Sequence, residues 1–255
     1  MPKNGVAKIA RLAAVAMLSA YFTFSQNIFG QNPPPYKGVS VHVEGVFVTP
    51  VPSVPLTALV EIESTQVLED GSTVVKKTFN DIARDFQGRI YNERRQFVSP
   101  SFTGKPRILS FHIYDPVTRL NTFFDPATHI ARQSTWPEAK KDVEVNTGSS
   151  ARDPLVEEED LGTATMENVL VHGLRRIRTV PANVSGIGKP VAVVDEYWYS
   201  EELHLNMLVK HEDPRSGQQM VTVTRVDRNE PKPTMFEIPR GYKVVDETPE
   251  NQSAN

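Results

Sequence analysis

The chain contains no cysteine. This absence excludes disulfide bonds, so the fold must be stabilised by burial of apolar side chains and by strand pairing. It also excludes lipid attachment in the manner of bacterial lipoproteins, because that modification needs a cysteine directly after the signal sequence. Metal sites built on thiolates are excluded for the same reason.

A hydrophobic run long enough for a permanent membrane anchor is also lacking at the N-terminus. The uncharged run from Leu12 to Phe24 has 13 residues, which as a helix span only about 20 Å of a hydrocarbon core about 30 Å thick. Small and polar residues follow it at 25–31, and three basic residues precede it: Lys3, Lys8 and Arg11. The pattern predicts a signal peptide over residues 1–30, with retention as an uncleaved anchor as the alternative. Membrane contact is expected only through this segment.

Basic charge is not in excess. The 28 basic and 31 acidic residues give a formal net charge of −3, and removal of the three basic residues of the leader leaves 25 basic residues and a net charge of −6. A mildly acidic surface argues against nucleic acid as a partner, because binding to phosphates needs a concentrated positive field. Together with the leader, this composition predicts an exported bacterial protein that is periplasmic or secreted.

Sequence motifs for catalysis are absent. There is no Gly-x-Ser-x-Gly elbow and no His-Glu-x-x-His helix, and Pro190 ends the glycine-rich segment 186–190 where a phosphate loop needs Ser or Thr. None of the six histidines has a spacing that places a pair on one strand face. We therefore expect no catalytic residue, no cofactor and no metal site, and we expect that the protein is not an enzyme.

Period-two alternation of apolar and polar residues, interrupted by turn residues, predicts a mainly β protein. Asp70-Gly71 is a strong hairpin signal, and Asp115-Pro116 and Asp125-Pro126 predict further turns. The expected strands are Val39 to Thr49, Leu56 to Leu68, Thr73 to Ala83, Arg89 to Val98, Arg107 to Tyr114, Leu120 to Phe124, Thr128 to Ser134, Val169 to Val180, Val191 to Tyr199, Leu203 to His211 and Met220 to Asp227.

These segments predict one domain over residues 36–245, an antiparallel meander that forms a strongly curved sheet or an open half barrel. A sandwich of two sheets is the alternative. Residues 136–160 lack apolar periodicity and predict a flexible surface excursion, residues 246–255 predict a disordered tail, and only the signal segment predicts a helix.

Arginines are spaced along neighbouring strands, with carboxylates between them. They are Arg84, Arg89, Arg94, Arg95 and Arg107, and later Arg175, Arg176 and Arg178. Interspersed acidic residues favour cross-strand ion pairs on an exposed face, and an anionic partner in the envelope is the alternative.

Three consecutive aromatic residues, Tyr197, Trp198 and Tyr199, must project to both faces of one strand. Such a strand either lies centrally in a packed core or lines a curved sheet around an apolar cavity. The side on which the two tyrosines lie therefore decides how this strand is used.

The segment from Glu159 to Val245, about a third of the chain, resembles a group of uncharacterised exported bacterial proteins. The residues that carry this resemblance are Leu161-Gly162-Thr163, Pro181-Ala182, Trp198-Tyr199-Ser200, Glu202-Leu203, Lys210-His211, Asp213-Pro214-Arg215, Gly217, Glu230-Pro231, Phe236, Pro239 and Gly241-Tyr242. More loosely, the Trp strand, the hairpin through a Gly turn and the Phe-x-x-Pro-x-Gly-Tyr tail resemble the periplasmic lipoprotein-carrier and sigma-factor-regulator superfamily. That resemblance implies an open antiparallel barrel around an apolar concavity, although the helices that plug the concavity in the carriers are not evident here.

Two functions follow from these observations. The first is a non-catalytic envelope protein that binds a lipid or another apolar ligand on the curved sheet; the second is a structural or protein-interaction module of the envelope with a filled core. The partner is accordingly a lipid or an envelope protein, and the oligomeric state stays open. The residues expected to line one apolar face are Val60, Ile62, Leu109, Phe111, Ile113, Tyr197, Tyr199, Val221 and Val223.

Overall fold

The computed structural model describes residues 48–136 and 155–248, which all belong to one compact unit, Pro35–Asn255. The predicted leader at 1–30, most of the strand expected from Val39 to Thr49, and residues 137–154 of the predicted excursion lie outside the described residues.

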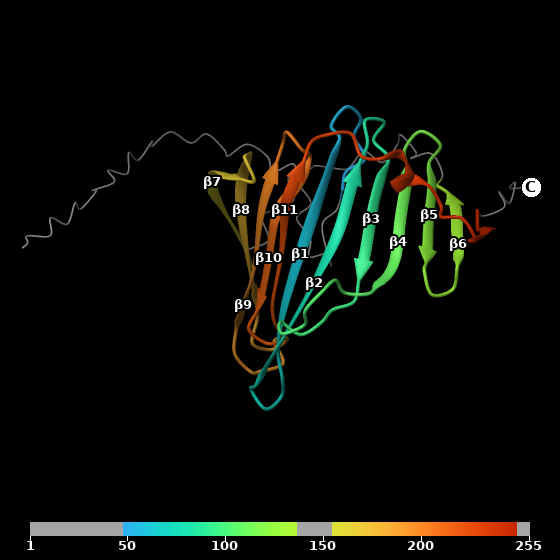
Figure 1. Cartoon of the computed structure of the whole chain (residues 1–255). Coiled ribbons are helices and arrows are strands. Elements are labelled where there is room, and N and C mark those ends of the chain that lie inside the picture. Colours follow the sequence, from blue (N-terminus) through green and yellow to red (C-terminus); the bar gives the residue numbers. More distant parts are fainter. Residues whose placement is uncertain (1–47, 137–154, 249–255) are drawn as a thin grey trace, which may run out of the picture. The chain divides into compact units, whose positions relative to one another are not determined.

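The described residues form twelve strands and one short 3-10 helix (Figure 1). Their bounds are β1 Leu56–Val67, β2 Thr73–Arg84, β3 Ile90–Arg95, β4 Ile108–Asp115, β5 Leu120–Asp125, β6 Ile130–Thr135, β7 Val156–Met166, β8 Val169–Val180, β9 Val191–Ser200, β10 Leu205–Asp213, β11 Gly217–Asp227, η1 Pro233–Phe236 and β12 Lys243–Asp246.

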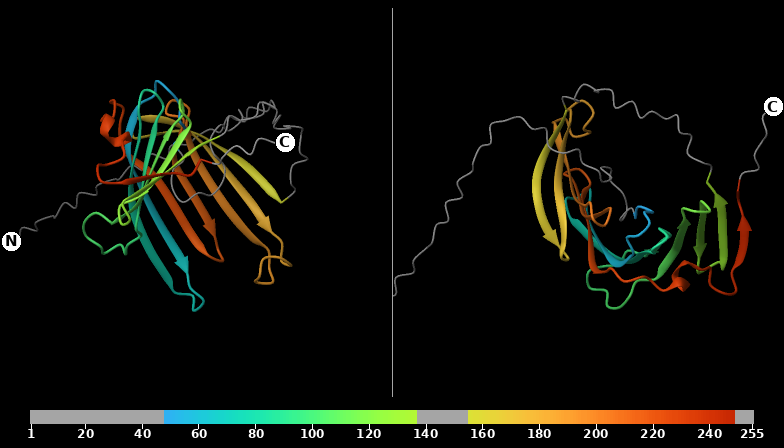
Figure 2. Two further views of the ribbon diagram at one scale, coloured as in Figure 1. Left: turned by 90° about the vertical axis from the view of Figure 1, so that its right-hand side faces the viewer. Right: turned by 90° about the horizontal axis from the view of Figure 1, so that it is seen from above.

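All twelve strands belong to one sheet in the order β12-β6-β5-β4-β3-β2-β1-β11-β10-β9-β8-β7. Every neighbouring pair is antiparallel except β12 and β6, which are parallel. The sheet is bent and does not close on itself, since β7 and β12 lie at its two ends (Figure 2). The prediction of a curved, open antiparallel meander is thus confirmed, and the alternative of a two-sheet sandwich is wrong for the described residues.

The turns between the strands follow the chemistry that their residues predict. In the β1–β2 hairpin, Gly71 has φ of +80°, and the Asp70 Oδ1 atom accepts hydrogen bonds from the Ser72 amide at 2.9 Å and the Ser72 hydroxyl at 2.6 Å. Asp115 and Asp125 each accept an amide hydrogen bond two residues further on, at 2.8 and 2.7 Å. Such turns hold an antiparallel register without help from distant residues.

Two strands were not expected from the sequence. Strand β7 occupies residues 156–166 and so includes the end of the predicted excursion. Most of its side chains are exposed, and ion pairs with β8 connect it to the sheet, Arg176 to Glu158 at 2.6 Å and Arg175 to Glu159 at 2.8 Å. Without a buried face, β7 has no apolar alternation to reveal it. Strand β12 includes Asp246 of the predicted tail, and its parallel partner β6 lies more than a hundred residues earlier.

The sheet has an inner and an outer face. The inner face is defined by Leu56, Ala58, Val60 and Ile62 of β1 and by the residues directly opposite them on neighbouring strands, because opposed residues project to the same side. In Figure 2 the segment 48–55, at the blue end of the described chain, lies inside the bend, whereas the red segment that contains η1 follows the outer side.

The apolar side of the sheet changes along its width. From β1 to β10 the main core cluster contains the inner residues Val60, Ile62, Val209, Val221 and Val223. On β2 to β6 a second cluster lies on the outer face under η1, and its buried members are Ala83, Tyr91, Ile113, Phe124, Ala131 and Phe236. Each half of the sheet is therefore amphipathic, but the two halves are turned in opposite directions.

Candidate functional site

An apolar row crosses four neighbouring strands on the inner face. Ile62 of β1 lies opposite Val221 of β11, Val221 opposite Val209 of β10, and Val209 opposite Tyr197 of β9. None of these four side chains is more than 3% exposed, and the neighbouring pair Val60 and Val223 is 1% exposed at each residue. On β1, β11, β10 and β9 the inner face is thus a continuous apolar surface that is closed to water.

Five of the nine residues predicted to line one apolar face lie together in this cluster: Val60, Ile62, Tyr197, Val221 and Val223. Tyr199 alternates with Tyr197 along β9 and is buried. Phe111 and Ile113 belong to the outer cluster on the opposite face, and the half-buried Leu109 belongs to neither. The prediction therefore placed on one face residues that lie on two opposite faces of the sheet. Alternation shows which residues of a strand share a face, but it does not show which face turns inward.

The aromatic strand β9 places both tyrosines on the inner side. Burial raises the pKa of the Tyr197 phenol to about 12, so that it stays protonated at neutral pH. Trp198 projects to the outer side, where its indole Nε1 donates to the Glu196 Oε1 atom at 2.7 Å. Its ring lies over Gly173, where a Cβ atom would be 2.8 Å from the Trp198 Cζ3 atom. The tyrosines thus lie on the inner side, and the tryptophan lies on the outer side, where it is half-buried and also packs against the main core cluster.

A buried arginine fixes the segment that lies against the inner face. Arg84 is 0% exposed, and its guanidinium donates to the carbonyl oxygens of Val54 at 2.7 Å, Thr49 at 2.8 Å and Leu203 at 2.7 Å. Burial lowers its pKa to about 10, so the side chain is still charged at neutral pH. Arg84 therefore joins the 48–55 segment and the β9–β10 turn to the edge of the apolar face.

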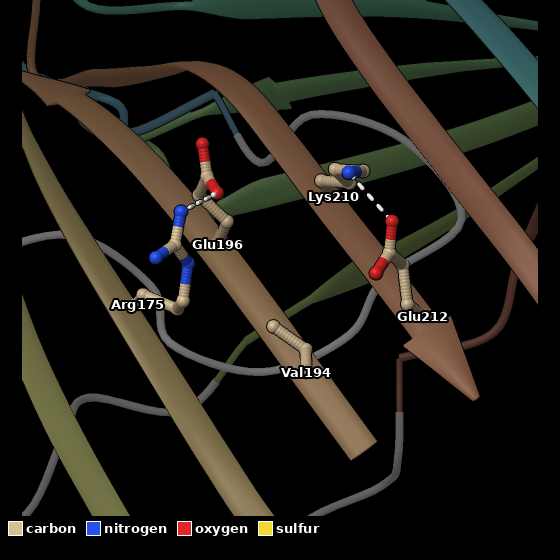
Figure 3. Close-up of a pocket in the computed structure, with 5 residues that line it drawn as sticks. All are labelled: Arg175, Val194, Glu196, Lys210 and Glu212. Carbon is tan, nitrogen blue, oxygen red and sulfur yellow. Dashed lines mark hydrogen bonds and ion pairs between the residues drawn. The ribbon is translucent and has the colours of Figure 1, made fainter. Parts of the chain in front are cut away.

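The outer face bears a shallow pocket of about 270 Å³ over strands β8, β9 and β10 (Figure 3). It is lined by Arg175, Val194, Glu196, Lys210 and Glu212. Arg175 pairs with Glu196 at 3.2 Å, and Lys210 pairs with Glu212 at 2.5 Å. Hydrogen bonds to Glu196 and Glu159 raise the pKa of Arg175. Each cation that lines the pocket is thus already neutralised by a carboxylate.

This pocket belongs to a charged row that crosses seven strands on the outer face. Each residue of the row lies opposite the next one, in the strand order β2-β1-β11-β10-β9-β8-β7. The residues are Lys77, Glu63, Met220, Lys210, Glu196, Arg175 and Glu159. A second, smaller pocket of about 100 Å³ lies over its other end, on β1, β2 and β11. Alternating charges on opposed positions stabilise strand pairing, and this part of the prediction of cross-strand ion pairs is confirmed for Arg175 and Arg176.

Replacing Glu196 with glutamine tests the part of the row that lies in the pocket. Glu196 is 19% exposed and interacts with both Arg175 and Trp198, so we expect a loss of about 1 kcal/mol in the free energy of unfolding and a shift in Trp198 emission. Glu212→Gln is the matched control, because Glu212 is 40% exposed and its pair with Lys210 lies in water. Urea denaturation and fluorescence in a Trp136→Phe background measure both effects. Equal losses for the two variants would contradict the expectation.

The prediction of an exposed arginine stripe is wrong for Arg84 and Arg95, since both are buried. The Arg95 guanidinium donates to the Pro106 carbonyl at 2.8 Å and pairs with Glu93, which also accepts a hydrogen bond from the Tyr91 hydroxyl at 2.8 Å. Burial raises the pKa of Tyr91. These groups connect β3 to the chain that leads into β4, and they have a structural role.

Two histidines pair with single carboxylates, His172 with Asp160 and His211 with Asp195, each at 2.6 Å. Within residues 48–136 and 155–248, no three side chains of the metal-binding types come together. In the same ranges no helix has the length and apolar character needed to cross a membrane.

No protein-family model matches the chain, and a search of curated proteins finds no relative. Among solved structures, the chain is similar to an uncharacterised conserved protein from Thermus thermophilus, with a TM-score of 0.40, 11% identity and coverage of 76% of this chain and 91% of that one. It is also similar to a chain of the MucA/MucB complex from Pseudomonas aeruginosa, with a TM-score of 0.39, 9% identity and coverage of 75% and 58%, so that it spans less than two thirds of that chain.

A LolA superfamily protein from Nitrosomonas europaea matches with a TM-score of 0.30, 10% identity and coverage of 73% of this chain and 91% of that one. The solved structures to which the chain is similar thus include a LolA superfamily protein and a chain of the MucA/MucB complex. At TM-scores of 0.40 and below, the similarity is too weak to assign a ligand or a partner.

Proposed function

We propose that this chain is a non-catalytic binding protein of the bacterial cell envelope that holds a lipid or another apolar ligand against the inner face of its curved sheet. The observation that carries this proposal is the apolar inner row from Ile62 to Tyr197 on a single-layered sheet. An apolar sheet face needs a second layer against it. Among the described residues, no helix and no second sheet covers the inner row. The side chains outside the strands that pack in its cluster are those of Val48, Val54, Phe97 and Leu203.

Entry of a ligand requires the inner row from Ile62 to Tyr197 to open, because its side chains are closed to water. The 48–55 segment is suited to this movement, since it has no regular secondary structure. Arg84 binds it through two hydrogen bonds, to the carbonyl oxygens of Thr49 and Val54. An envelope location is supported by the predicted leader at 1–30 and by the superfamily resemblance of the C-terminal third.

Native mass spectrometry of the protein purified from its own host tests the proposal. We expect a co-purifying lipid that organic extraction removes, and we expect the extracted protein to bind an apolar dye such as 1,8-ANS at one saturable site. A spectrum without adducts, together with no dye binding after extraction, would overturn the proposal.

A pair of variants locates the site on one face. Leu174 of β8 lies opposite Tyr197 and continues the inner row, where it is half-buried, so Leu174→Glu should place a charge at the margin of the apolar face with limited cost to folding. We expect at least a tenfold loss of dye affinity. Met220→Glu is the control, because Met220 is 41% exposed and belongs to the outer charged row. Equal dye binding by both variants would contradict an inner-face site.

The second candidate is a protein-interaction module of the envelope with a filled core. It is favoured by the near-zero exposure of the inner row, which is what a permanently packed core shows. This candidate predicts no lipid, no dye binding and a specific neighbour captured by crosslinking in cells. A monomer without lipid, dye or crosslinked neighbour would exclude both candidates.

A further inference from the structure

The inner face changes character beyond β3. Opposed positions lead from the apolar half into β4 and β5: Ile90 lies opposite Tyr114, and Asn92 lies opposite His112, which in turn lies opposite Phe123. Phe123 is 47% exposed. Trp136 directly follows β6, four positions after Arg132 and therefore on the same side of the extended chain, and it is 51% exposed. Exposed rings gathered on one side of a sheet indicate a contact surface, since scattered single apolar residues are the norm.

Four aromatic side chains on this surface form two ring pairs. His112 and Phe123 are stacked, with ring centroids 4.3 Å apart and an interplanar angle of 10°. Tyr114 and Trp136 are 5.2 Å apart with an angle of 36°. The aromatic strip is defined here as these four residues. Because His112 and Tyr114 are two positions apart on β4, the two pairs are adjacent along the strand.

Neutral polar groups lie beside the aromatic strip. The His112 Nε2 atom is 2.5 Å from the Asn121 Oδ1 atom, and burial lowers the pKa of His112, so that its ring is neutral at pH 7. Arg132, opposite Phe123, pairs with Glu247. Asn92 and Ser134 lie on the same face. The surface thus combines ring faces with neutral hydrogen-bonding groups.

We propose that the aromatic strip binds an uncharged saccharide chain of the cell envelope. One side of a pyranose ring presents C–H groups that pack on an aromatic face, whose π-system is electron-rich, while its hydroxyl groups bind amides, hydroxyls and guanidinium groups at the edge. The amide of Asn92 and the hydroxyl of Ser134 match the hydroxyl groups of a glycan, and Arg132, the cation opposite Phe123, is already paired with Glu247. A purely apolar chain would cover the side chains of Asn92 and Ser134 without offering them a hydrogen bond.

This inference is independent of the lipid proposal, because it concerns the exposed half of the inner face. The test is affinity electrophoresis of the full chain in native gels that contain dextran, mannan, laminarin or glycol chitin, with titration of chitotetraose by tryptophan fluorescence. We expect at least one of these neutral glycans to retard the wild-type chain. Phe123→Ala and Trp136→Ala should each weaken that retardation at least tenfold.

Two exposed aromatic residues elsewhere serve as controls. Phe86 is 59% exposed and Phe102 is 42% exposed, and both lie in turns away from the strip. Phe86→Ala and Phe102→Ala should migrate like the wild type, and circular dichroism should show all four variants folded. The proposal is overturned if no glycan retards the wild type, or if the strip variants behave like the controls. Loss of dye or vesicle binding by the strip variants with unchanged glycan binding would also overturn it.

Discussion

Replacing Arg84 with leucine is expected to lower the free energy of unfolding by about 3–5 kcal/mol, because removal of one partner from a buried charged network leaves the others without hydrogen bonds. The side chain is 0% exposed and donates to three carbonyl oxygens from three separate segments, those of Thr49, Val54 and Leu203. Leucine supplies none of these bonds. We therefore expect the 48–55 segment and the β9–β10 turn to separate from β2, with higher dye binding by the remaining folded protein.

Arg107→Leu is the matched control, since Arg107 is exposed just before β4 and surface substitutions usually change stability by less than about 0.5 kcal/mol. Arg84→Lys should be intermediate, because an ammonium group keeps the charge but cannot reach three acceptors in the planar arrangement of a guanidinium group. Urea denaturation at pH 7 measures all three variants. A loss below about 1 kcal/mol for Arg84→Leu would show that the three carbonyls find other donors.

Local chemistry made much of the fold predictable. Asp70 and Gly71 define a hairpin within four residues, and a strand such as β1 alternates buried and less buried positions along its length. Strand β7 was not predicted, because Glu157, Glu158 and Glu159 lie opposite residues of β8 and do not pack into a core. Its place in the sheet depends on partners that are visible only once the chain has folded.

The candidate site was less predictable than the fold. Ile62 and Ile113 occupy equivalent places in two apolar alternating segments, yet Ile62 projects to the inner face and Ile113 to the outer face under η1. The covering segment that decides this, with Met235 and Phe236, follows the last long strand and shows no period of its own. Arg84 likewise looked like a surface charge, because nothing in the sequence marks the three carbonyl oxygens around it.

The reversal of polarity along the sheet has a functional consequence. A sheet with one apolar face throughout would have a single ligand surface, but here the inner face is apolar on the side of β9 to β11 and aromatic with neutral polar groups on the side of β4 to β6. Under the two proposals, the apolar part binds a lipid and the aromatic part binds a saccharide. The two proposals therefore concern different strands and can be tested with separate variants.

Replacing Gly217 with alanine is expected to lower the free energy of unfolding by about 3–5 kcal/mol. Gly217 begins β11 after the Asp-Pro-x-Ser turn and has φ of +118°, a conformation that costs a residue with a side chain roughly 1–3 kcal/mol. A Cβ atom there would lie 1.9 Å from the carbonyl oxygen of Thr65. Since the contact is with backbone, relief requires β1 and β11 to separate, which adds an overpacking cost of roughly 1–3 kcal/mol.

Gly71→Ala is the matched control, because Gly71 also has a positive φ, +80°, but no atom lies within 4 Å of the added Cβ. It should cost only about 1–2 kcal/mol, the conformational term alone. The pairing that Gly217 permits sets Ile62 opposite Val221 and thus aligns the inner row, so Gly217→Ala should also change dye binding, whereas Gly71→Ala should not. Equal unfolding free energies for the two variants would mean that β1 and β11 adjust without loss, and that the register of the inner row is not fixed at this turn.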